Sequence, residues 1–318
     1  MNTHYTFGRQ RAKPAPDDST KRRFDPASFV HVGRRDYQQD ALMTNMPRGE
    51  PFGIAVLADG MGGHRGGEVA GNVAMGAAFA EISVQLAHFR NGQVTLPAAL
   101  VASVDRANDA ITNQIITRAD LAGMGTTLVI CAFAGPALYW ASVGDSPLYH
   151  YRDGALTRLN EDHSMAPQID AMVQSGMIDA IDAATHPQRN QLVSALCGKD
   201  IAKVDCPDAP LALKTGDIIL LASDGLQTLT DDQIAQILRK RQRAESEEIA
   251  SALLQSVLEV GKADQDNTSL IVVKVLNDDP PPRPVQPVAL ADAQTEPPAS
   301  DDPQIEQASD LLNKALQL

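Results

Sequence analysis

Residues 54–68 read IAVLADGMGGHRGGE, in which five apolar residues end on Asp59 and pass into a glycine-rich turn. Residues 218–225 repeat the arrangement as IILLASDG, where Asp224 follows the apolar run and Gly225 comes next. Short apolar runs bounded by turn residues predict buried strands. Each of these strands therefore carries an aspartate at its end, beside a glycine that lets another backbone segment come close.

The same patterns predict the order of elements around these two strands, at 53–58 and 218–222. Further strands are predicted at 29–33, 41–45, 126–133, 138–143, 148–151 and 268–275. Helices are predicted at 68–86, 97–116, 166–175, 232–239 and 245–260, and Asp153-Gly154 as a hairpin turn. Hairpin-linked strands followed by paired helices indicate an α+β fold, with antiparallel sheets covered by helices rather than βαβ units.

Both ends of the chain differ in composition from its middle. Residues 1–23 carry six Lys or Arg and two Asp without apolar periodicity, which predicts a flexible basic arm over 1–24. Residues 277–303 are acidic and rich in proline, and we expect an extended linker there. Residues 304–318 place apolar side chains at the spacing of an amphipathic helix. The pattern alone does not decide whether such a helix packs back on the domain, frays, or docks a partner.

Composition excludes several classes of protein. The 318 residues carry a net charge of −13 and only 4% aromatic side chains, which argues against a nucleic-acid binder with a basic stripe or a base-stacking surface. No run of 18 apolar residues exists, so we expect neither a membrane span nor a secretory signal. Three scattered cysteines (Cys131, Cys197 and Cys206) are too few for a disulfide framework, which favours a reducing compartment and hence the cytoplasm.

Three more aspartates fall at the ends of predicted strands. Asp145 closes LYWASVGDS, Asp266 precedes the last strand, and Asp40 opens the second strand. A strand-end aspartate usually caps a turn, and capping remains a possible role for any one of these aspartates taken singly. Burying five unpaired acids is costly, however, unless positive charge is supplied. Divalent Mg²⁺ and Mn²⁺ meet that need, because they prefer carboxylate, carbonyl and water ligands.

Six motifs follow one another between residues 28 and 276. They are Asp59-Gly60-Met61-Gly62-Gly63-His64 with Gly67-Glu68, Gly125-Thr126-Thr127, Val143-Gly144-Asp145-Ser146, Asp162-His163-Ser164, Ala222-Ser223-Asp224-Gly225 and Asp266-Asn267. Together they resemble the motifs of metal-dependent Ser/Thr protein phosphatases of type 2C, the PPM family, and its bacterial branch in particular. The resemblance implies a domain over 25–276 built as a four-layer αββα sandwich, with two antiparallel sheets flanked by pairs of helices and a flap at 163–190.

The resemblance also implies roles for particular residues. The implied metal ligands are Asp59 as the carboxylate that bridges two ions, the carbonyl of Gly60, Asp224, Asp266, and Asp145 for a weaker third ion. Asp40 would hold metal-bound water, and Arg35 would grip the substrate phosphate. The implied cofactors are two Mg²⁺ or Mn²⁺ ions that activate a water to hydrolyse phosphoserine or phosphothreonine on proteins. The implied partners are phosphorylated proteins and a bacterial Ser/Thr kinase whose action the enzyme reverses, and we expect a monomer.

Several positions depart from the family pattern. Met61 stands where eukaryotic members carry a histidine that is a candidate general acid, so that role is unassigned. His64 could protonate the leaving group or contact substrate, and the alternative is a merely solvated turn histidine. Pro147 replaces a frequent arginine, and Gln39 stands where many members have glutamate. Arg34 adjoins Arg35, and the motif spacing favours Arg35 as the phosphate-binding residue.

Three hypotheses for the function come from different classes. The first is an active Mg²⁺- or Mn²⁺-dependent phosphoserine/phosphothreonine phosphatase. The second is a binding module that keeps the fold without turnover, disfavoured because Asp59, Asp224 and Asp266 are all present. The third is a two-metal phosphodiesterase, disfavoured by the absence of a basic track. No cysteine is followed six positions later by arginine, so the local signature of cysteine-dependent phosphatases is absent.

Overall fold

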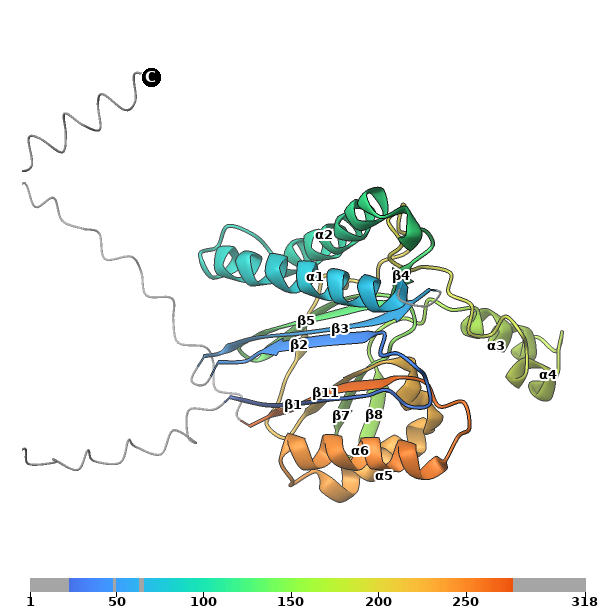
Figure 1. The fold of residues 1–318 in the computed structure, drawn as a ribbon. Helices are drawn as coiled ribbons and strands as arrows, with labels where there is room; N and C mark the ends of the chain where they lie inside the picture. The colour runs from blue at the N-terminus through green and yellow to red at the C-terminus, as the bar shows by residue number, and fades with distance from the viewer. Residues whose placement is uncertain (1–22, 48–49, 63–65, 277–318) are drawn as a thin grey trace, which may run out of the picture. The chain divides into compact units, whose positions relative to one another are not determined.

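The computed structural model describes residues 23–47, 50–62 and 66–276 (Figure 1). The linker expected at 277–303, the helix expected at 304–318 and His64 lie outside the described residues, as do residues 1–22 of the expected arm. The arm was predicted to run through residue 24, and that boundary is wrong. Arg23 and Phe24 are buried, and Phe24 opens the first strand, so the domain begins before residue 25.

Eleven strands in the described residues form two sheets, and every strand pair is antiparallel. The first sheet has the order β1 (Phe24–His31), β11 (Thr268–Val275), β10 (Ile218–Ala222), β7 (Leu148–Arg152) and β8 (Ala155–Arg158). The second has the order β2 (Asp40–Asn45), β3 (Phe52–Met61), β5 (Leu128–Ala134), β6 (Ala137–Val143) and β9 (Leu211–Ala212), with β4 (Gly125–Thr126) beside β3.

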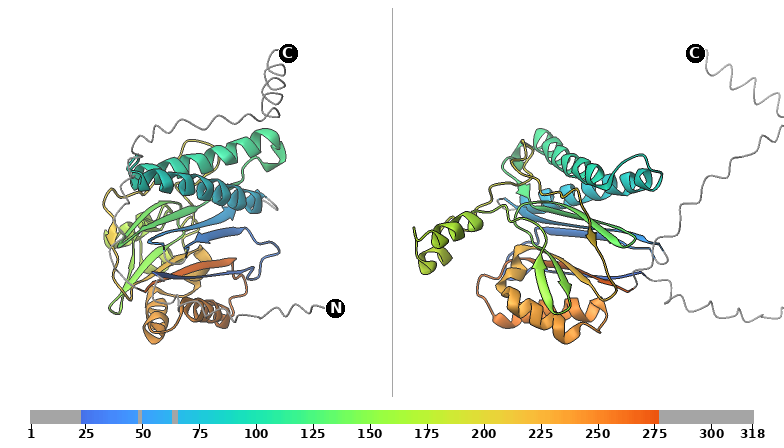
Figure 2. Two further views of the ribbon diagram at one scale, coloured as in Figure 1. Left: turned by 90° about the vertical axis from the view of Figure 1, so that its left-hand side faces the viewer. Right: turned by 180° about the vertical axis from the view of Figure 1, so that it is seen from behind.

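Two pairs of helices cover the outer faces of the sheets, so that four layers stack in Figure 1 and in both views of Figure 2. The second sheet is covered by α1 (Gly66–Arg90) and α2 (Leu96–Thr117), and the first by α5 (Asp231–Arg241) and α6 (Ser246–Val260). Thr230 and Gln233 form a capping box at the start of α5. Gly261, in the left-handed conformation, ends α6. The αββα sandwich expected from the resemblance is confirmed.

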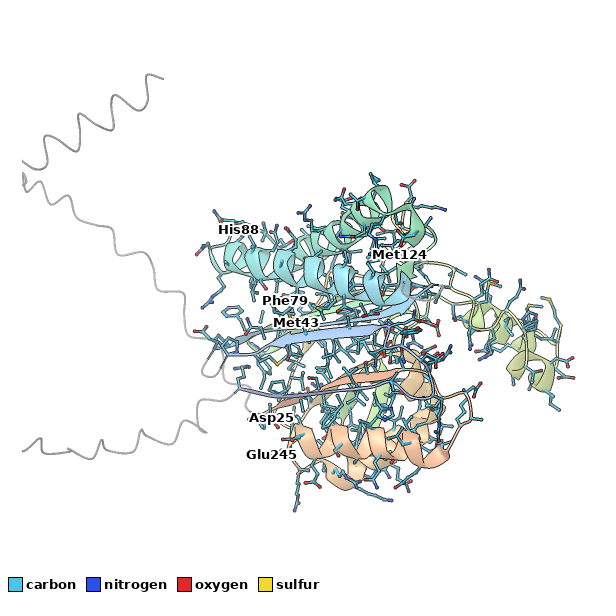
Figure 3. All side chains as sticks on the ribbon, in the orientation of Figure 1. Asp25, Met43, Phe79, His88, Met124 and Glu245 are labelled. Carbon is cyan, nitrogen blue, oxygen red and sulfur yellow. The ribbon has the colours of Figure 1, made fainter. Side chains whose placement is uncertain are left out.

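The alternation of side chains along β3 explains why IAVLADG is apolar without interruption. Ala55 and Leu57 point into the core between the two sheets, whereas Ile54, Val56 and Ala58 pack under α1 and α2. Both faces of the strand are therefore buried, and the space between the layers is filled with side chains (Figure 3). The second Asp-Gly strand, β10, is likewise apolar throughout, because it lies between the inter-sheet core and the layer formed by α5 and α6.

Within the described residues, α1 is long and apolar enough, by length and composition alone, to cross a membrane. The apolar residues of α1 pack instead in the core between this helix and the second sheet, which contains Ala70, Ala74, Ala78 and Ile82. This packing accounts for the composition of α1.

The helix predicted at 166–175 is present as α3 (Ala166–Gln174), and a second helix, α4 (Ala180–Ala184), follows it. They project from the side of the sandwich in Figure 1, and an isolated bridge between Ser164 and Leu192 closes the base of the projection. The sequence prediction missed α4, a single turn that begins where the Asp179 carboxylate accepts from the Asp182 N–H. The two helices form the flap that the resemblance implied at 163–190.

Candidate active site

The registers of the two sheets bring the predicted acids to one end of the sandwich. In the first sheet, the start of β11 lies opposite the ends of β1 and β10, and the end of β10 lies opposite the start of β7. Asp266, Asp224 and Asp145, which adjoin these strand ends, are therefore neighbours. In the second sheet, Asp40 lies directly opposite Asp59 in the pairing of β2 with β3.

The electrostatic coupling of these carboxylates confirms that they are close. Burial, together with the charges of Asp40, Asp224, Asp145 and Asp266, raises the pKa of Asp59 well above its usual range. Burial and the neighbouring Asp145 and Asp266 raise the pKa of Asp224 to about 7. Burial raises the pKa of Asp40 to about 6 and that of Asp145 to about 6. Negative charge at this end of the fold is therefore under-compensated by the protein itself.

Asp266 and Arg35 behave differently from the other predicted site residues. The Arg35 Nη2 donates to Asp266 Oδ2 at 2.7 Å, and both side chains are partly exposed. The remaining carboxylate oxygen, Asp266 Oδ1, accepts from the Asn267 N–H at 2.8 Å. The structure pairs Arg35 with a predicted metal ligand at the edge of the acid cluster. Its contact with phosphate stays a prediction.

A cavity of about 510 Å³ opens over this cluster. Its lining includes Arg35, Asp145, Asp162, Arg189, Asp224 and Asp266. Arg189 belongs to the flap segment, where it makes two hydrogen bonds to Asp170 at 2.7 and 3.1 Å. The flap and the acid cluster therefore face a common space.

The donor set fits a hard divalent cation that keeps water ligands. Asp40 Oδ1 is buried without a hydrogen-bond partner among the described residues. No group of three or more His, Cys, Asp or Glu side chains in the described part of the chain is arranged to hold one ion. Mg²⁺ uses few carboxylates and keeps several waters. Asp59, Asp224 and Asp266, which the resemblance implies for one ion, would therefore have to draw closer together when that ion binds. The ligand roles predicted for Asp59, Gly60, Asp224, Asp266 and Asp145 stay predictions.

Comparisons with known proteins identify the family of this domain. The family model described as Protein phosphatase 2C matches residues 30–259. The chain belongs to the protein phosphatase 2C family. The serine/threonine protein phosphatase PstP of Mycobacterium tuberculosis is 36% identical over 229 residues, which cover 71% of this chain and 41% of that protein. The serine/threonine phosphatase stp of Listeria welshimeri is 32% identical over 224 residues, 70% of this chain and 84% of that protein.

Solved structures agree with the assignment to the protein phosphatase 2C family. The crystal structure of the M. tuberculosis phosphatase PstP/Ppp has a TM-score of 0.65 and 31% identity, and covers 80% of this chain and 100% of that chain. A structure of the catalytic domain of PstP, in complex with two manganese ions, has a TM-score of 0.62 and 31% identity over 80% of this chain and 99% of that chain. This chain spans less than half the length of the mycobacterial PstP sequence that it matches.

In this phosphatase 2C domain, two threonines hold the backbone of Asp59. Thr127 Oγ1 accepts from the Asp59 N–H at 3.0 Å, and Thr126 Oγ1 donates to the Asp59 carbonyl at 2.8 Å. Thr127 Oγ1 is also 2.7 Å from Ser146 Oγ, next to Asp145. The Gly125-Thr126-Thr127 motif was singled out in the sequence without a role. Its spacing from Asp59 held no clue to this contact, because the partners are 67 and 68 residues apart.

Asn267 is a second residue whose role sequence reasoning missed. Its Nδ2 donates to the carbonyls of Val32 and Tyr37, and its Oδ1 accepts from the Gln39 N–H at 2.8 Å. One buried side chain therefore shapes the loop that carries Arg35 and leads into Asp40. The only sign of this role in the sequence was the position of Asn267, an amide residue between the candidate ligand Asp266 and the strand β11.

Gln39, a departure from the family pattern, faces the glycine-rich turn. Its Nε2 donates to the Gly62 carbonyl at 3.3 Å, and its own carbonyl accepts from the Gly60 N–H at 3.2 Å. A Cβ added at Gly60 would lie 2.1 Å from the Gly67 carbonyl oxygen, which explains why glycine is required there. A glutamate at position 39 would set a carboxylate against the Gly62 carbonyl, so the amide suits this turn.

The cysteines play no part in this arrangement. All three fall within the described residues and are free thiols, and Cys131 is buried in the inter-sheet core. Cys131 is therefore a core residue.

Proposed function

We propose that this chain is a protein phosphatase that hydrolyses phosphoserine and phosphothreonine esters on proteins with the help of Mg²⁺ or Mn²⁺. The observation that carries the proposal is the meeting of Asp40, Asp59, Asp145 and Asp224 from both sheets, each with a raised pKa, beneath an open cavity. Buried and half-buried acids of this kind are tolerated when they bind cations, and they cluster at functional sites. The relatives named as serine/threonine phosphatases support the substrate class.

Asp59, Asp224 and Asp266, with the carbonyl of Gly60, are the residues that would hold two divalent ions, and Asp145 would contribute to a third. The mycobacterial structure that contains two manganese ions supports this number and type of ion. Bound divalent ions offset the charge of a phosphate dianion and lower the pKa of a water that serves as nucleophile. The free Oδ1 of Asp40 would accept a hydrogen bond from that water and orient it.

Arg35 would bind the phosphate from the edge of the cluster. Its ion pair with Asp266 uses Nη2, and the planar fork leaves other N–H groups to donate to phosphate oxygens. The proton donor to the leaving oxygen is unassigned, and His64 is one candidate for that role. The substrates would be proteins phosphorylated by a Ser/Thr kinase, whose action this chain would reverse.

Turnover of a phosphothreonine peptide and of p-nitrophenyl phosphate, with Mn²⁺ and with excess chelator, tests the proposed function. We expect hydrolysis with Mn²⁺ and its loss in chelator, restored when Mn²⁺ is added back. Binding of Mn²⁺ without turnover would instead indicate a binding module. Cleavage of a phosphodiester in preference to both monoesters would indicate a different hydrolase.

Replacing Arg35 tests its contact with phosphate. We expect Arg35→Ala to raise KM for the phosphopeptide about 10-fold, equivalent to ~1.4 kcal/mol of binding, and to change kcat much less. Stability should barely change, because the ion pair to Asp266 is partly exposed and such pairs contribute little. Arg34→Ala is the matched control, because Arg34 is the exposed residue next to Arg35 and carries the same charge. An unchanged KM in Arg35→Ala, or an equal rise in Arg34→Ala, would contradict the assignment.

A further inference from the structure

A buried hydroxyl joins the two groups of acids in the candidate centre. Asp40 and Asp59 belong to the second sheet, whereas Asp224 follows β10 of the first sheet. The Ser223 Oγ donates to Asp40 Oδ2 at 2.8 Å across the space between the sheets. This hydrogen bond therefore connects the strand end that carries Asp224 with the strand that carries Asp40.

The direction of the Ser223 hydroxyl is fixed by a second hydrogen bond. The Ser269 N–H donates to Ser223 Oγ at 2.9 Å, and the Ser223 N–H donates to the Ser269 carbonyl at 2.9 Å. Since Ser223 Oγ already accepts from an N–H, its own hydrogen is left to donate, and Asp40 is its acceptor. Ser223 and Ser269 are both 0% exposed, which removes bulk water as a competing partner.

The Asp40 carboxylate is held on one side and left free on the other. Its Oδ2 is bound to Ser223, whereas its buried Oδ1 has no hydrogen-bond partner among the described residues. The Asp40 N–H is already used, because it donates to Gln38 Oε1 at 2.9 Å. Ser223 thus fixes one oxygen of Asp40, and the side chains of Ser269 and Asp59 are the other close neighbours of this carboxylate.

We propose that Ser223 is a positioning residue that orients the Asp40 carboxylate and sets the separation between the acids of the two sheets. The inference rests on the proposed phosphatase function, in which Asp40 orients the attacking water. Ser223 is fully buried and does not line the cavity, so it acts through Asp40 rather than on substrate. Its loss should lower the rate of turnover rather than the binding of the phosphopeptide.

The full chain with Mn²⁺ and a phosphothreonine peptide provides the test. We expect Ser223→Ala to lower kcat about 10- to 100-fold, the effect of one lost hydrogen bond to a charged group, with KM changed less than about threefold. Ser223→Thr keeps the hydroxyl and should recover most of kcat. In an Asp40→Ala background, Ser223→Ala should cost nothing further, because its target is gone.

Ser246→Ala is the matched control for the loss of a buried serine hydroxyl. Ser246 is 0% exposed, and its Oγ donates to the carbonyl of Asp25, which lies at the far end of β1 from the site (Figure 3). We expect this variant to lose stability but to keep wild-type kcat and KM. Thermal melts of all variants separate a folding defect from a positioning effect. Should Ser223→Thr fail to fold, the double-mutant cycle of Ser223 and Asp40 still tests the positioning role.

Titration calorimetry with Mn²⁺ provides a readout independent of turnover, in which Ser223→Ala should bind Mn²⁺ more weakly than Ser246→Ala. Wild-type kcat in Ser223→Ala, an equal loss in Ser246→Ala, additive losses with Asp40→Ala, or unchanged Mn²⁺ binding would each overturn the positioning role. If the wild type itself shows no Mn²⁺-dependent turnover, the proposed function fails, and the calorimetry still tests the positioning role.

Discussion

Asp59→Asn is expected to lower kcat at least about 1,000-fold, equivalent to ~4 kcal/mol of transition-state stabilisation, while making the cation-free protein more stable. The pKa of Asp59 is raised well above its usual range, because the carboxyl is withdrawn from water and faces the charges of four other acids. The amide keeps the size of the side chain and one oxygen but removes the charge that would bridge two cations. The same charge is unfavourable in the fold without cations, which is why stability should rise.

Two measurements check this pair of effects. Steady-state turnover with saturating Mn²⁺ gives the loss in kcat, and thermal unfolding in excess chelator at neutral pH gives the gain in Tm, which we expect to exceed about 2 °C. Asp182→Asn, at the exposed flap helix α4, is the control and should change neither quantity. An Asp59→Asn variant that is active, or one that is destabilised in chelator, would contradict the account.

The stability of the cation-free protein is expected to fall as pH rises from about 4 to about 7, and added Mn²⁺ should reverse this trend. The pKa of Asp40 is raised to about 6, that of Asp145 to about 6, and that of Asp224 to about 7. The pKa of Asp59 is raised as well. Between the ordinary carboxyl pKa and these values, the folded state holds protons that the unfolded chain has released, so unfolding becomes easier as pH rises.

Two other groups with shifted pKa values also affect how the stability of the cation-free protein depends on pH. Burial lowers the pKa of His163, so this residue favours folding as pH rises toward its ordinary value of 6.5, whereas the four carboxyls with raised pKa values act in the opposite sense. The hydrogen bonds from Arg152 and His150 outweigh burial and hold the pKa of Asp217 below its usual range, so its contribution is lost only in acid, below the window of interest. Each unit of pKa difference corresponds to ~1.4 kcal/mol, so the net decrease should be measurable.

Urea midpoints at a series of pH values between 4.5 and 8, in chelator and in Mn²⁺, measure this dependence. A cation that binds only the folded state stabilises it by ~2.7 kcal/mol at 100 times its Kd. Asp224→Asn should flatten the pH dependence in chelator and weaken the response to Mn²⁺. Stability that rises with pH in chelator, or that Mn²⁺ leaves unchanged, would show that the carboxylates are not an uncompensated cation site.

The strands that carry the acids were predictable, because β3 and β10 are buried on both faces and therefore read as uninterrupted apolar runs. The beginning of β1 was not, because Pro26 and Asp25 interrupt the pattern. Pro26 is tolerated because β1 is an edge strand of its sheet, a fact that only the assembled sheet reveals. Likewise, one turn of helix such as α4 carries too little periodicity to be distinguished from a loop.

Some residues of the candidate site could likewise be predicted from the sequence, and others could not. Its acids could be found from the sequence, since charge at the end of a buried strand requires an explanation. The residues that hold them could not, because the contacts of Thr127 with Asp59 and of Ser223 with Asp40 join positions 68 and 183 residues apart. The ion pair of Arg35 with Asp266 was equally hidden, since both were assigned separate tasks and their proximity follows from the register of β1 with β11.

Crystals of the full chain grown with Mn²⁺, with diffraction recorded on both sides of the manganese absorption edge, would test the metal site most directly. We expect two anomalous peaks between the sheets, with Asp59 in contact with both ions and with Asp224 and Asp266 bound to one of them. The Asp59→Asn protein should lose at least one peak. Ions bound elsewhere, or no anomalous density beside Asp59 at a Mn²⁺ concentration that supports turnover, would contradict a cation site built by the acids of the two sheets.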